Sequence, residues 1–311
     1  MIVVDDGSTD ATAEVAERFG VRLPRLARQS GAAVARNVGA EHARADLLFF
    51  TDADVLLRPD ALARAVAMFE RCQQVSAVFG SYTAWTVHDD FFSVYKNLVH
   101  HLTHQAANPE AATFWSGVGA IRASAFWAVG GFDPSDTRTS DVEDIALGYR
   151  LTRAGFRVRL DRELQGTHAK RYTLASLVRS DLLHRAIPWT RLMLREGIAR
   201  RDLNTGVGSL FSAAAVLLLG PALVGGLVVP PLSGLAAGLF LLYLLLNRRL
   251  FAACARRNPA FLLPAVAMTA LYYVYATAGA AIGLLLHVVR PREPAARAFR
   301  GRVESHAGQV E

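Results

Sequence analysis

The carboxyl-terminal part of the chain is apolar over three consecutive spans, and this limits what it can fold into. The spans cover about Val207–Val229, Leu232–Leu246 and Phe261–Val289. A helix needs about 20 apolar residues to cross a hydrocarbon layer of about 30 Å, so the first and third spans are long enough. The second reaches that length when its flanking residues are added. The first two spans carry no internal charge and are joined by a short turn with two prolines, which predicts a helical hairpin in a membrane.

Arginines beside the spans predict their orientation. The formal net charge is +7, and Lys96 and Lys170 are the only lysines. Basic residues gather on the cytoplasmic side of membranes and attract anionic lipid head groups. The arginines that border the spans are Arg195, Arg200, Arg201, Arg248, Arg249, Arg256 and Arg257. They place both ends of the hairpin on the cytoplasmic side, and no basic helix interleaved with aromatic residues indicates a nucleic-acid site.

The third span conflicts with this rule. A third crossing would take the chain to the opposite side, yet the arginines that follow it favour the cytoplasmic side. These are Arg290, Arg292, Arg297, Arg300 and Arg302. Either the third span is re-entrant, or the rule is overridden, or the number of spans is wrong. We expect a multi-pass protein of the cell's inner membrane, without a cleavable signal peptide because the chain begins in a strand.

The first 190 residues alternate short apolar strands with helices. We expect strands at Ile2–Val4, Leu47–Phe50, Val75–Val78 and Phe114–Ile121. The helices carry apolar stripes, formed by Val15, Ala16 and Phe19 in the first and by Leu62, Val66 and Phe69 in the third. Such alternation predicts an α/β fold, with a mainly parallel sheet flanked by helices. Cys72 and Cys254 lie far apart, so they predict neither a zinc site nor a disulfide.

Two aspartates, Asp52 and Asp54, follow the apolar run Leu47–Phe50. Residues just past the carboxyl end of such a strand point into the ligand crevice of an open α/β sheet. Two carboxylates there repel each other unless a cation lies between or beside them. A hard divalent ion that binds a diphosphate needs only one or two protein carboxylates. The segment predicts a metal–diphosphate site, and a solvated acidic pair on the surface is the alternative.

Two further segments carry candidate site residues. Phe114–Ile121 contains two glycines, Gly117 and Gly119, which remove side chains where a ligand could approach closely. Glu143 and Asp144 open a helix. Acidic residues in a first helical turn are also favoured by the helix dipole, so helix capping is the alternative to a functional role.

Five motifs agree in order and spacing with one enzyme family. They are Val4-Asp5-Asp6-Gly7-Ser8-Thr9-Asp10, Gly31-Ala32-Ala33-Val34-Ala35-Arg36-Asn37-Val38-Gly39, Thr51-Asp52-Ala53-Asp54, Gly130-Gly131-Phe132-Asp133 and Glu143-Asp144. The series resembles glycosyltransferase family 2, whose members have the GT-A fold. The resemblance implies a GT-A-like catalytic domain over residues 1–190, an interfacial linker over 191–206, about three transmembrane helices over 207–289 and a basic polar tail over 290–311.

The resemblance also implies roles for individual residues. Donor binding falls to Asp5, Asp6, Ser8, Arg36, Asn37 and Asp52, and Mg²⁺ or Mn²⁺ would be bound by Asp54, Asp52 and His168. The sugar and acceptor pocket would include Trp115, Gly117, Gly131 and Asp133, to which we add Arg185 and Trp189. Asp144 is implied as the general base, with Glu143 beside it. Adjacent helical side chains diverge by about 100°, so only one of the two faces the acceptor squarely.

The chain departs from the family pattern at two points. The usual first strand is missing, either because the start is wrong or because the chain is truncated, and this strand normally helps to bind the base of the donor. The Gln-x-x-Arg-Trp motif of processive members is replaced by His184-Arg185-Ala186-Ile187-Pro188-Trp189. We therefore expect transfer of a single sugar rather than polymer synthesis.

The expected reaction is a metal-dependent, inverting transfer from a nucleotide-sugar to a lipid or polyprenyl phosphate at the cytoplasmic membrane face. A carboxylate base takes the proton of the acceptor hydroxyl, and the metal neutralises the leaving diphosphate. Arg185 and Arg191 precede the first span and could pair with an acceptor phosphate. Ordinary interfacial anchoring is the alternative for these two arginines.

Other hypotheses remain at this stage. A phosphohydrolase of the HAD type also places Asp-x-Asp after a strand, but it needs a downstream lysine, and Lys96 lies in a helical segment without that context. An inactive or truncated membrane protein that binds nucleotide-sugars is a second alternative. A transporter is disfavoured, because the spans contain no ionisable residue before His287.

Overall fold

A computed structural model describes residues 1–134, 142–197 and 206–289 of the chain. Its sheet contains β1 (Leu47–Thr51), β2 (Val55–Leu57), β3 (Val75–Thr86), β4 (Glu110–Ala111), β5 (Val118–Arg122) and β6 (Arg157–His168). The strand order is β1-β5-β3-β6-β2, and β4 pairs with β6. Because only three residues separate β1 from β2, the acidic turn with Asp52 and Asp54 joins two strands that pair with different partners.

The sheet is mixed. Among the described strands only β3 and β6 pair in parallel, while β5 runs antiparallel to β1 and β3, and β2 and β4 run antiparallel to β6. The α/β class is confirmed, but the expectation of a mainly parallel sheet is wrong. That expectation assumed one crossover helix between successive strands. Instead, the chain between β3 and β5 includes a long helix and an irregular segment, and β5 enters between β1 and β3 in the opposite direction.

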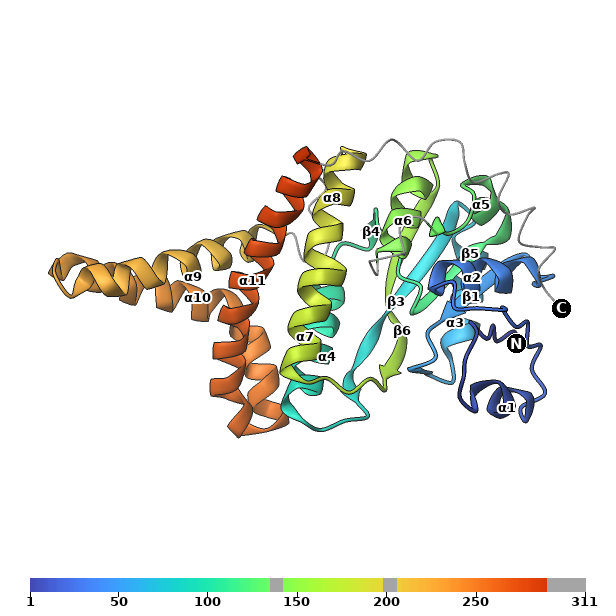
Figure 1. Ribbon diagram of the computed structural model, residues 1–311, viewed down its shortest axis with the longest axis horizontal. Helices are drawn as coiled ribbons and strands as arrows, with labels where there is room; N and C mark the ends of the chain where they lie inside the picture. The colour runs from blue at the N-terminus through green and yellow to red at the C-terminus, as the bar shows by residue number, and fades with distance from the viewer. Residues whose placement is uncertain (135–141, 198–205, 290–311) are drawn as a thin grey trace.

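Helices cover both faces of this sheet (Figure 1). They are α1 (Thr12–Glu17), α2 (Ala32–Glu41), α3 (Ala61–Arg71), α4 (Phe91–Ala106), α5 (Ala123–Ala128) and α6 (Glu143–Arg153). Consecutive strand residues enter opposite cores, as the two-residue period of a strand requires. Phe79 and Ile121 pack with residues of α2, α5 and α6, whereas Val78 and Ala120 pack with residues of α3.

The prediction that two apolar stripes face the core is largely wrong, because most of their residues are exposed. Val15 and Phe19 of the first stripe are 48% and 76% exposed, and α1 buries Ala13 instead. Of the other stripe only Phe69 is buried: α3 buries Ala61, Ala65 and Phe69 and exposes Leu62 and Val66. Alanine allows a helix to approach a sheet closely, so the face with alanines turns inward while the larger residues remain outside.

A continuous helical segment leads from the sheet to the apolar region. It consists of α7 (Leu174–Arg179), the π-helical η2 (Ser180–Ala186) and α8 (Ile187–Glu196). The linker expected over residues 191–206 therefore begins inside a helix, because α8 continues to Glu196. Residues 198–205, the predicted tail 290–311 and Asp141 lie outside the described residues.

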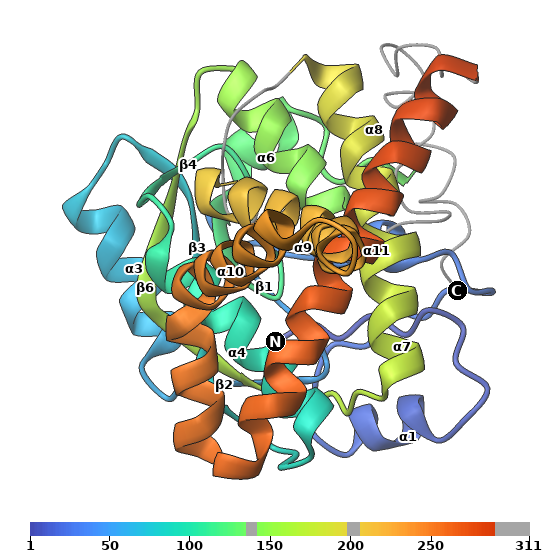
Figure 2. The ribbon, with the colours of Figure 1, turned by 90° about the vertical axis from the view of Figure 1, so that its left-hand side faces the viewer.

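Three helices long and apolar enough to cross a membrane follow. They are α9 (Val207–Gly226), α10 (Pro230–Arg257) and α11 (Leu262–Val289), the last preceded by the 3-10 turn Pro259–Phe261. α9 and α10 pack against each other, which confirms the predicted hairpin. The hairpin projects away from the sheet, whereas α11 lies along η2 and α8 (Figure 1, Figure 2).

Candidate active site

Asp54 and His168 are brought together by two paired strands. β2 pairs with the end of β6 so that Val55 faces His168, and Ala169 N donates to the carbonyl oxygen of Asp54 at 2.7 Å. His168 Nε2 lies 3.5 Å from Asp54 Oδ2, and the Asp54 side chain is 41% exposed. The contact with His168 lowers the pKa of Asp54 below its usual value. The carboxylate is therefore ionised at neutral pH and open to solvent.

Tyr82 of β3 packs behind His168. The two rings are stacked, with centroids 4.3 Å apart and planes 12° from parallel, and Thr86 Oγ1 donates to the carbonyl oxygen of His168 at 2.8 Å. Burial raises the pKa of Tyr82 well above its usual value, and the charge of Asp52 adds to the effect. The phenol therefore stays neutral. Tyr82 belongs to none of the sequence motifs, and only the pairing of β3 with β6 reveals its place.

Trp115 packs on another side of Tyr82, with ring centroids 4.7 Å apart. Its indole also contacts His100 and His104 of α4, at centroid distances of 4.8 and 5.4 Å. A Cβ atom on Gly117 would lie 2.5 Å from Cζ2 of Trp115, far inside a normal contact. Gly117 therefore leaves the space that the indole ring occupies.

Ser116 connects this aromatic cluster to α6. Its backbone N–H donates to Asp144 Oδ2 at 3.3 Å, and its hydroxyl lies 3.5 Å from the same oxygen. Asp144 is buried, and this burial raises its pKa to about 7, with a further contribution from the charge of Glu143. A pKa near the working pH suits a group that accepts a proton during a reaction. Ser116 lies inside the predicted glycine-containing segment Phe114–Ile121, between Trp115 and Gly117, but its contact with Asp144 was not predicted.

Arg36 of α2 joins the acidic pair of α6 to the acidic turn after β1. One of its terminal nitrogens, Nη1, donates to Glu143 Oε1 and the other, Nη2, to Asp52 Oδ1, both at 2.7 Å. Burial acts to lower the pKa of Arg36, but the charges of the two carboxylates outweigh it and raise the pKa above its usual value. Arg36 thus remains a cation between two anions.

These contacts form a ring of residues when the links along the backbone between Trp115 and Ser116, between Glu143 and Asp144, and from Asp52 to Asp54 are included. The ring runs from Asp54 through His168, Tyr82, Trp115, Ser116, Asp144, Glu143 and Arg36 to Asp52. It brings the predicted metal residues, the predicted base and one predicted donor residue into one constellation, although Arg36 and Glu143 are 107 residues apart in the chain. We call it the acidic ring below.

Asn37, next to Arg36 on α2, fastens the predicted glycine turn. Its Nδ2 donates to the carbonyl of Phe132 at 2.8 Å, and its Oδ1 accepts from the Phe132 N–H at 2.9 Å. Gly131 has a φ of 68°, and a Cβ atom there would lie 2.8 Å from Asn37 Oδ1. The amide of Asn37 is buried in this clamp, which places Asp133 at the end of the turn and gives Asn37 a positioning role.

The amino-terminal aspartates also bind backbone groups. Asp5 is buried, accepts from Ser8 N at 2.9 Å and pairs with Arg25 at 3.2 Å. The hydrogen bonds from Ser8 are the main reason that the pKa of Asp5 is lowered. Asp6 accepts from the N–H groups of Ser30 and Gly31 at 2.7 and 2.8 Å, so it fixes the loop that leads into α2 and hence Arg36.

The two predicted acceptor residues of the helical segment, Trp189 and Arg185, have different surroundings. Trp189, near the start of α8, donates from Nε1 to Tyr149 OH of α6 at 3.1 Å. The two helices pack together in the same hydrophobic cluster. Arg185 of η2 is near enough to Tyr82 for its charge to oppose the rise in the pKa of that phenol. Arg185 therefore lies within electrostatic range of the ring.

The acidic ring fits a metal ion that is shared with a substrate. In residues 1–134, 142–197 and 206–289, no group of three or more His, Cys, Asp or Glu side chains could bind a metal by itself. Asp54 and His168 offer two ligand atoms, while Asp52 Oδ1 is engaged by Arg36. Mg²⁺ or Mn²⁺ can complete its coordination with water and diphosphate oxygens. Two protein ligands suit such a ternary site.

The lysine that a phosphohydrolase would need is used elsewhere. Lys96 of α4 is buried and forms an ion pair with Asp181 of η2, so it contacts neither Asp52 nor Asp54. This contact removes the main residue that the phosphohydrolase hypothesis requires.

Comparison with known proteins supports one family. Residues 1–130 match the model described as glycosyl transferase family 2. Validoxylamine A glucosyltransferase of Streptomyces hygroscopicus subsp. jinggangensis is 29% identical over an alignment of 201 residues that covers 54% of this chain and 47% of that protein. The chain thus matches about half the length of that relative. Succinoglycan biosynthesis protein ExoA of Rhizobium meliloti is 28% identical over 225 residues, covering 64% of this chain and 66% of that protein.

A solved structure shares the fold. The mannosyltransferase PcManGT of Pyrobaculum calidifontis, solved in complex with GDP-Man and Mn²⁺, superposes with a TM-score of 0.52 at 20% identity, and the match covers 94% of this chain and 78% of that one. This likeness confirms the GT-A-like fold that the motifs implied. The chain therefore carries a glycosyl transferase family 2 domain, over residues 1–130.

Proposed function

We propose that the protein is a metal-dependent, inverting glycosyltransferase that moves one sugar from a nucleotide-sugar to a lipid or polyprenyl phosphate acceptor at the cytoplasmic face of a membrane. The observation that carries the proposal is the acidic ring. It combines a solvent-open carboxylate next to a histidine, at Asp54, with a buried carboxyl group whose pKa is about 7, at Asp144.

The donor would bind at the side of the ring that contains Asp52 and Asp54. The solved mannosyltransferase with the same fold contains GDP-Man and Mn²⁺, which supports a nucleotide-sugar and a divalent ion here. A bound Mg²⁺ or Mn²⁺ neutralises negative charge on a leaving diphosphate. Asp54 and His168 would bind that ion, and Arg36 would orient Asp52 next to it.

The acceptor would be activated at the opposite side, by Asp144. A hydroxyl oxygen attacks the anomeric carbon while its proton passes to the Asp144 carboxylate, and the bond from that carbon to the diphosphate breaks with its electron pair leaving on the diphosphate. General-base assistance of this kind contributes roughly 10²–10⁴-fold. Attack opposite the leaving group inverts the anomeric centre, so an α-linked donor gives a β-linked product.

The apolar helices support an acceptor that resides in the bilayer. Arg185 lies within electrostatic range of Tyr82 and belongs to the helical segment that leads to α9, so it could pair with an acceptor phosphate. The relative ExoA is named for succinoglycan biosynthesis, which is compatible with a lipid-linked saccharide. For an acceptor phosphate, whose oxygen is already ionised, Asp144 matters less.

A donor screen tests the proposal. The full-length protein, solubilised in detergent, is incubated with Mn²⁺, individual nucleotide-sugars and a membrane lipid extract, and release of nucleoside diphosphate is measured. We expect release with at least one donor that depends on the extract. With a hydroxyl acceptor, release should fall more than tenfold in Asp144→Asn with donor affinity unchanged, and with an acceptor phosphate the fall should be smaller. Donor binding without release in every combination would favour the alternative of a nucleotide-sugar-binding protein that does not transfer.

A further inference from the structure

α11 is bound to the soluble domain by hydrogen bonds. Tyr95 OH of α4 and Thr269 Oγ1 lie 3.0 Å apart, and both groups are buried. Six residues further on, Tyr275 OH donates to Asp181 Oδ2 of η2 at 2.9 Å. Asp181 is also the partner of the buried Lys96. The middle of α11 thus contacts a buried ion pair of the domain that carries the acidic ring.

Close packing continues along the same face of α11. A Cβ atom on Gly279 would lie 2.7 Å from the Ala186 Cβ, and one on Gly283 would lie 2.8 Å from the carbonyl oxygen of Ile187. These glycines let α11 and the η2–α8 segment approach until their backbones almost touch. Contacts from Thr269 to Gly283 cover about 21 Å of helix, at 1.5 Å per residue.

This packing is incompatible with a simple crossing by α11. If this stretch of α11 lay in the hydrocarbon layer, the helices that touch it would have to enter that layer as well. η2 and α8 carry Asp181, Arg185, Arg191, Arg195 and Glu196. A single charged side chain at the centre of a bilayer costs at least about 2.5 kcal/mol. The charges of η2 and α8 therefore oppose a position of α11 inside the hydrocarbon layer.

The orientation of the helices agrees with this argument. Figure 1 shows α11 running across the direction of α9 and the adjoining part of α10, which alone project away from the rest of the molecule, while the end of α10 lies beside α11. Figure 2 views the hairpin from its tip. The face of α11 turned away from η2 and α8 exposes large apolar side chains, among them Leu271, Val274, Ile282 and Leu285. A helix with one face on protein and the other apolar can lie in the boundary layer of a bilayer.

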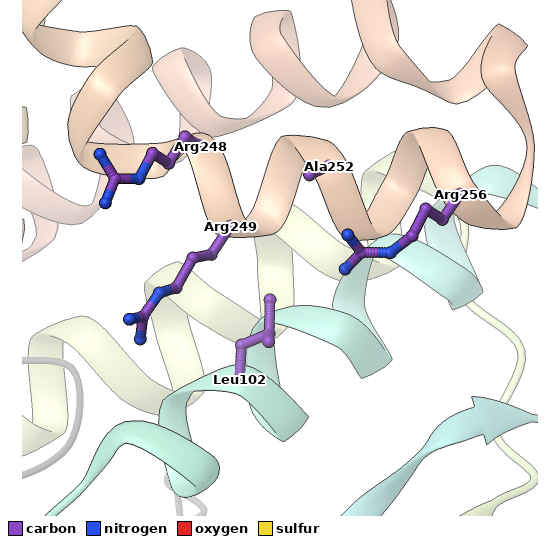
Figure 3. Close-up of a pocket in the computed structure, with 5 residues that line it drawn as sticks. All are labelled: Leu102, Arg248, Arg249, Ala252 and Arg256. Atoms are coloured by element: carbon purple, nitrogen blue, oxygen red, sulfur yellow. The ribbon is translucent and has the colours of Figure 1, made fainter.

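A cationic pocket lies on α10 beside this surface. A cavity of about 430 Å³ is lined by Leu102 of α4 and by Arg248, Arg249, Ala252 and Arg256 of α10 (Figure 3). The three guanidinium groups are exposed, and none is within ion-pair distance of a carboxylate in the described part of the chain. Arg257, by contrast, is paired with Asp89 at 2.5 Å. Guanidinium groups around an apolar floor match a phosphate ester with an attached hydrocarbon part.

We propose that α11 does not cross the bilayer but lies along an anionic membrane surface, where the α10 pocket receives the phosphate of a phospholipid head group. The chain then crosses the membrane only with the α9–α10 hairpin. The end of α11 at Val289 then falls on the same side of the membrane as both ends of the hairpin, which removes the conflict in the sequence. The proposal requires that the protein is attached to a membrane, but it does not require that the protein transfers a sugar.

Cysteine labelling in oriented membranes tests the position of α11. Exposed residues are replaced one at a time in the full chain with Cys72→Ser, namely Glu70→Cys on the catalytic domain, Leu227→Cys at the hairpin tip and Val288→Cys at the end of α11. Cys254 is buried and stays, and the chain without an added cysteine is the blank. A membrane-impermeant maleimide is applied to right-side-out and to inverted vesicles.

We expect the variant at position 288 to react in the same vesicles as the variant at position 70, and the variant at position 227 to react in the opposite ones. Reaction of position 288 together with position 227 would overturn the proposal, because α11 would then span the bilayer. The readout requires only insertion of the chain, so it is separate from any failure of the glycosyltransferase assignment.

Lipid binding tests the pocket with a matched control. The triple variant Arg248→Gln, Arg249→Gln, Arg256→Gln is compared with Arg18→Gln, Arg44→Gln, Arg71→Gln, which removes three exposed arginines from the soluble domain. Phosphatidylglycerol bound to the detergent-purified full chain is quantified by native mass spectrometry, with phosphatidylcholine and inorganic phosphate as separate arms.

We expect at least fivefold less phosphatidylglycerol on the α10 variant, an unchanged amount on the control variant, and weak retention of phosphatidylcholine. Equal loss in the two variants would mean that general charge, not the pocket, binds the lipid. Displacement of phosphatidylglycerol by millimolar inorganic phosphate would assign the pocket to a soluble anion and would also contradict the proposal.

Discussion

His168 Nε2 lies 3.5 Å from Asp54 Oδ2, at a point where the histidine is buried and the carboxylate reaches solvent. The imidazole is held in place by the stacked ring of Tyr82, while Thr86 binds its backbone carbonyl. This arrangement limits how far the histidine can move. An ion that binds at Asp54 therefore meets a second ligand whose orientation is already set, as supporting contacts set it in many metal sites.

We expect Asp54→Ala to reduce metal-dependent donor hydrolysis or transfer by at least about 100-fold, because loss of a metal ligand removes several kcal/mol of charge stabilisation. Asp60→Ala is the control, since Asp60 is an exposed aspartate at the start of α3. Titration of Mn²⁺ in the presence of nucleoside diphosphate, followed by electron paramagnetic resonance, checks the cause. Full activity in the Asp54 variant would remove the metal role.

A second prediction concerns pH. The base form of Asp144 is the ionised one, and burial raises its pKa to about 7. kcat/KM for donor hydrolysis, in which water is the acceptor, should therefore rise with pH and level off above about 7. The assay avoids acceptor phosphates, whose own ionisation would confuse the profile.

Two neighbours of Asp144 should move the rising part of this pH profile, the acidic limb, in opposite directions along the pH axis. The charge of Glu143 raises the pKa of Asp144 and the charge of Arg36 lowers it. Glu143→Gln should therefore shift the limb to lower pH, and Arg36→Gln should shift it to higher pH. A limb that stays in place in both variants would show that another group controls the profile.

The third prediction concerns the glycine turn. Asn37→Ala leaves the N–H and the carbonyl of Phe132 buried without their partners, at a cost of about 1–3 kcal/mol for each group. Thermal unfolding of the detergent-solubilised protein should show a clear fall in Tm, and turnover should fall because Asp133 loses its position. Asn108→Ala, which removes an exposed amide, should leave both unchanged. Equal Tm values for the two variants would show that the clamp contributes nothing.

The fourth prediction concerns the space under Trp115. Gly117→Ala places a methyl group 2.5 Å from the indole, so the ring must leave its contact with Tyr82. Overpacking of this kind costs about 1–3 kcal/mol, and we expect kcat/KM to fall at least tenfold with a changed near-ultraviolet circular dichroism spectrum. Gly208→Ala is the control, because open space surrounds that position. An unchanged spectrum would mean that the indole is not fixed as described.

Local patterns in the sequence predicted the parts of the site that belong to one segment. Asp52, Asp54, Glu143 and Asp144 follow from their place at a strand end or a helix start, and the motif resemblance adds Arg36 and His168. The ring as a whole could not be predicted, because Tyr82 and Ser116 enter it through contacts between distant strands and helices. Tyr82 has no local signature, whereas Ser116 lies between two predicted pocket residues, Trp115 and Gly117, with nothing that points to its contact with Asp144.

The direction of the strands and the buried faces of α1 and α3 were predicted wrongly, for related reasons. β5 runs antiparallel to β1 and β3 because of the path that the chain takes after α4. A short stretch of sequence contains no information about that path. In α3 the inward face is formed by Ala61 and Ala65, whose small side chains permit close approach, while the larger Leu62 and Val66 are exposed. A hydrophobicity pattern weights large residues and therefore selects the wrong face.

The contact of Tyr275 with the Lys96–Asp181 pair has a consequence for how the protein can be handled. A chain cut after Gly197 would lose the hydroxyl that donates to Asp181 and would uncover the faces of α4 and η2 that α11 shields. The soluble part is then not an independent folding unit, and its expression without the apolar helices should yield aggregated material. We therefore expect assays of this protein to need the intact polypeptide, with a lipid or detergent environment supplied from the start.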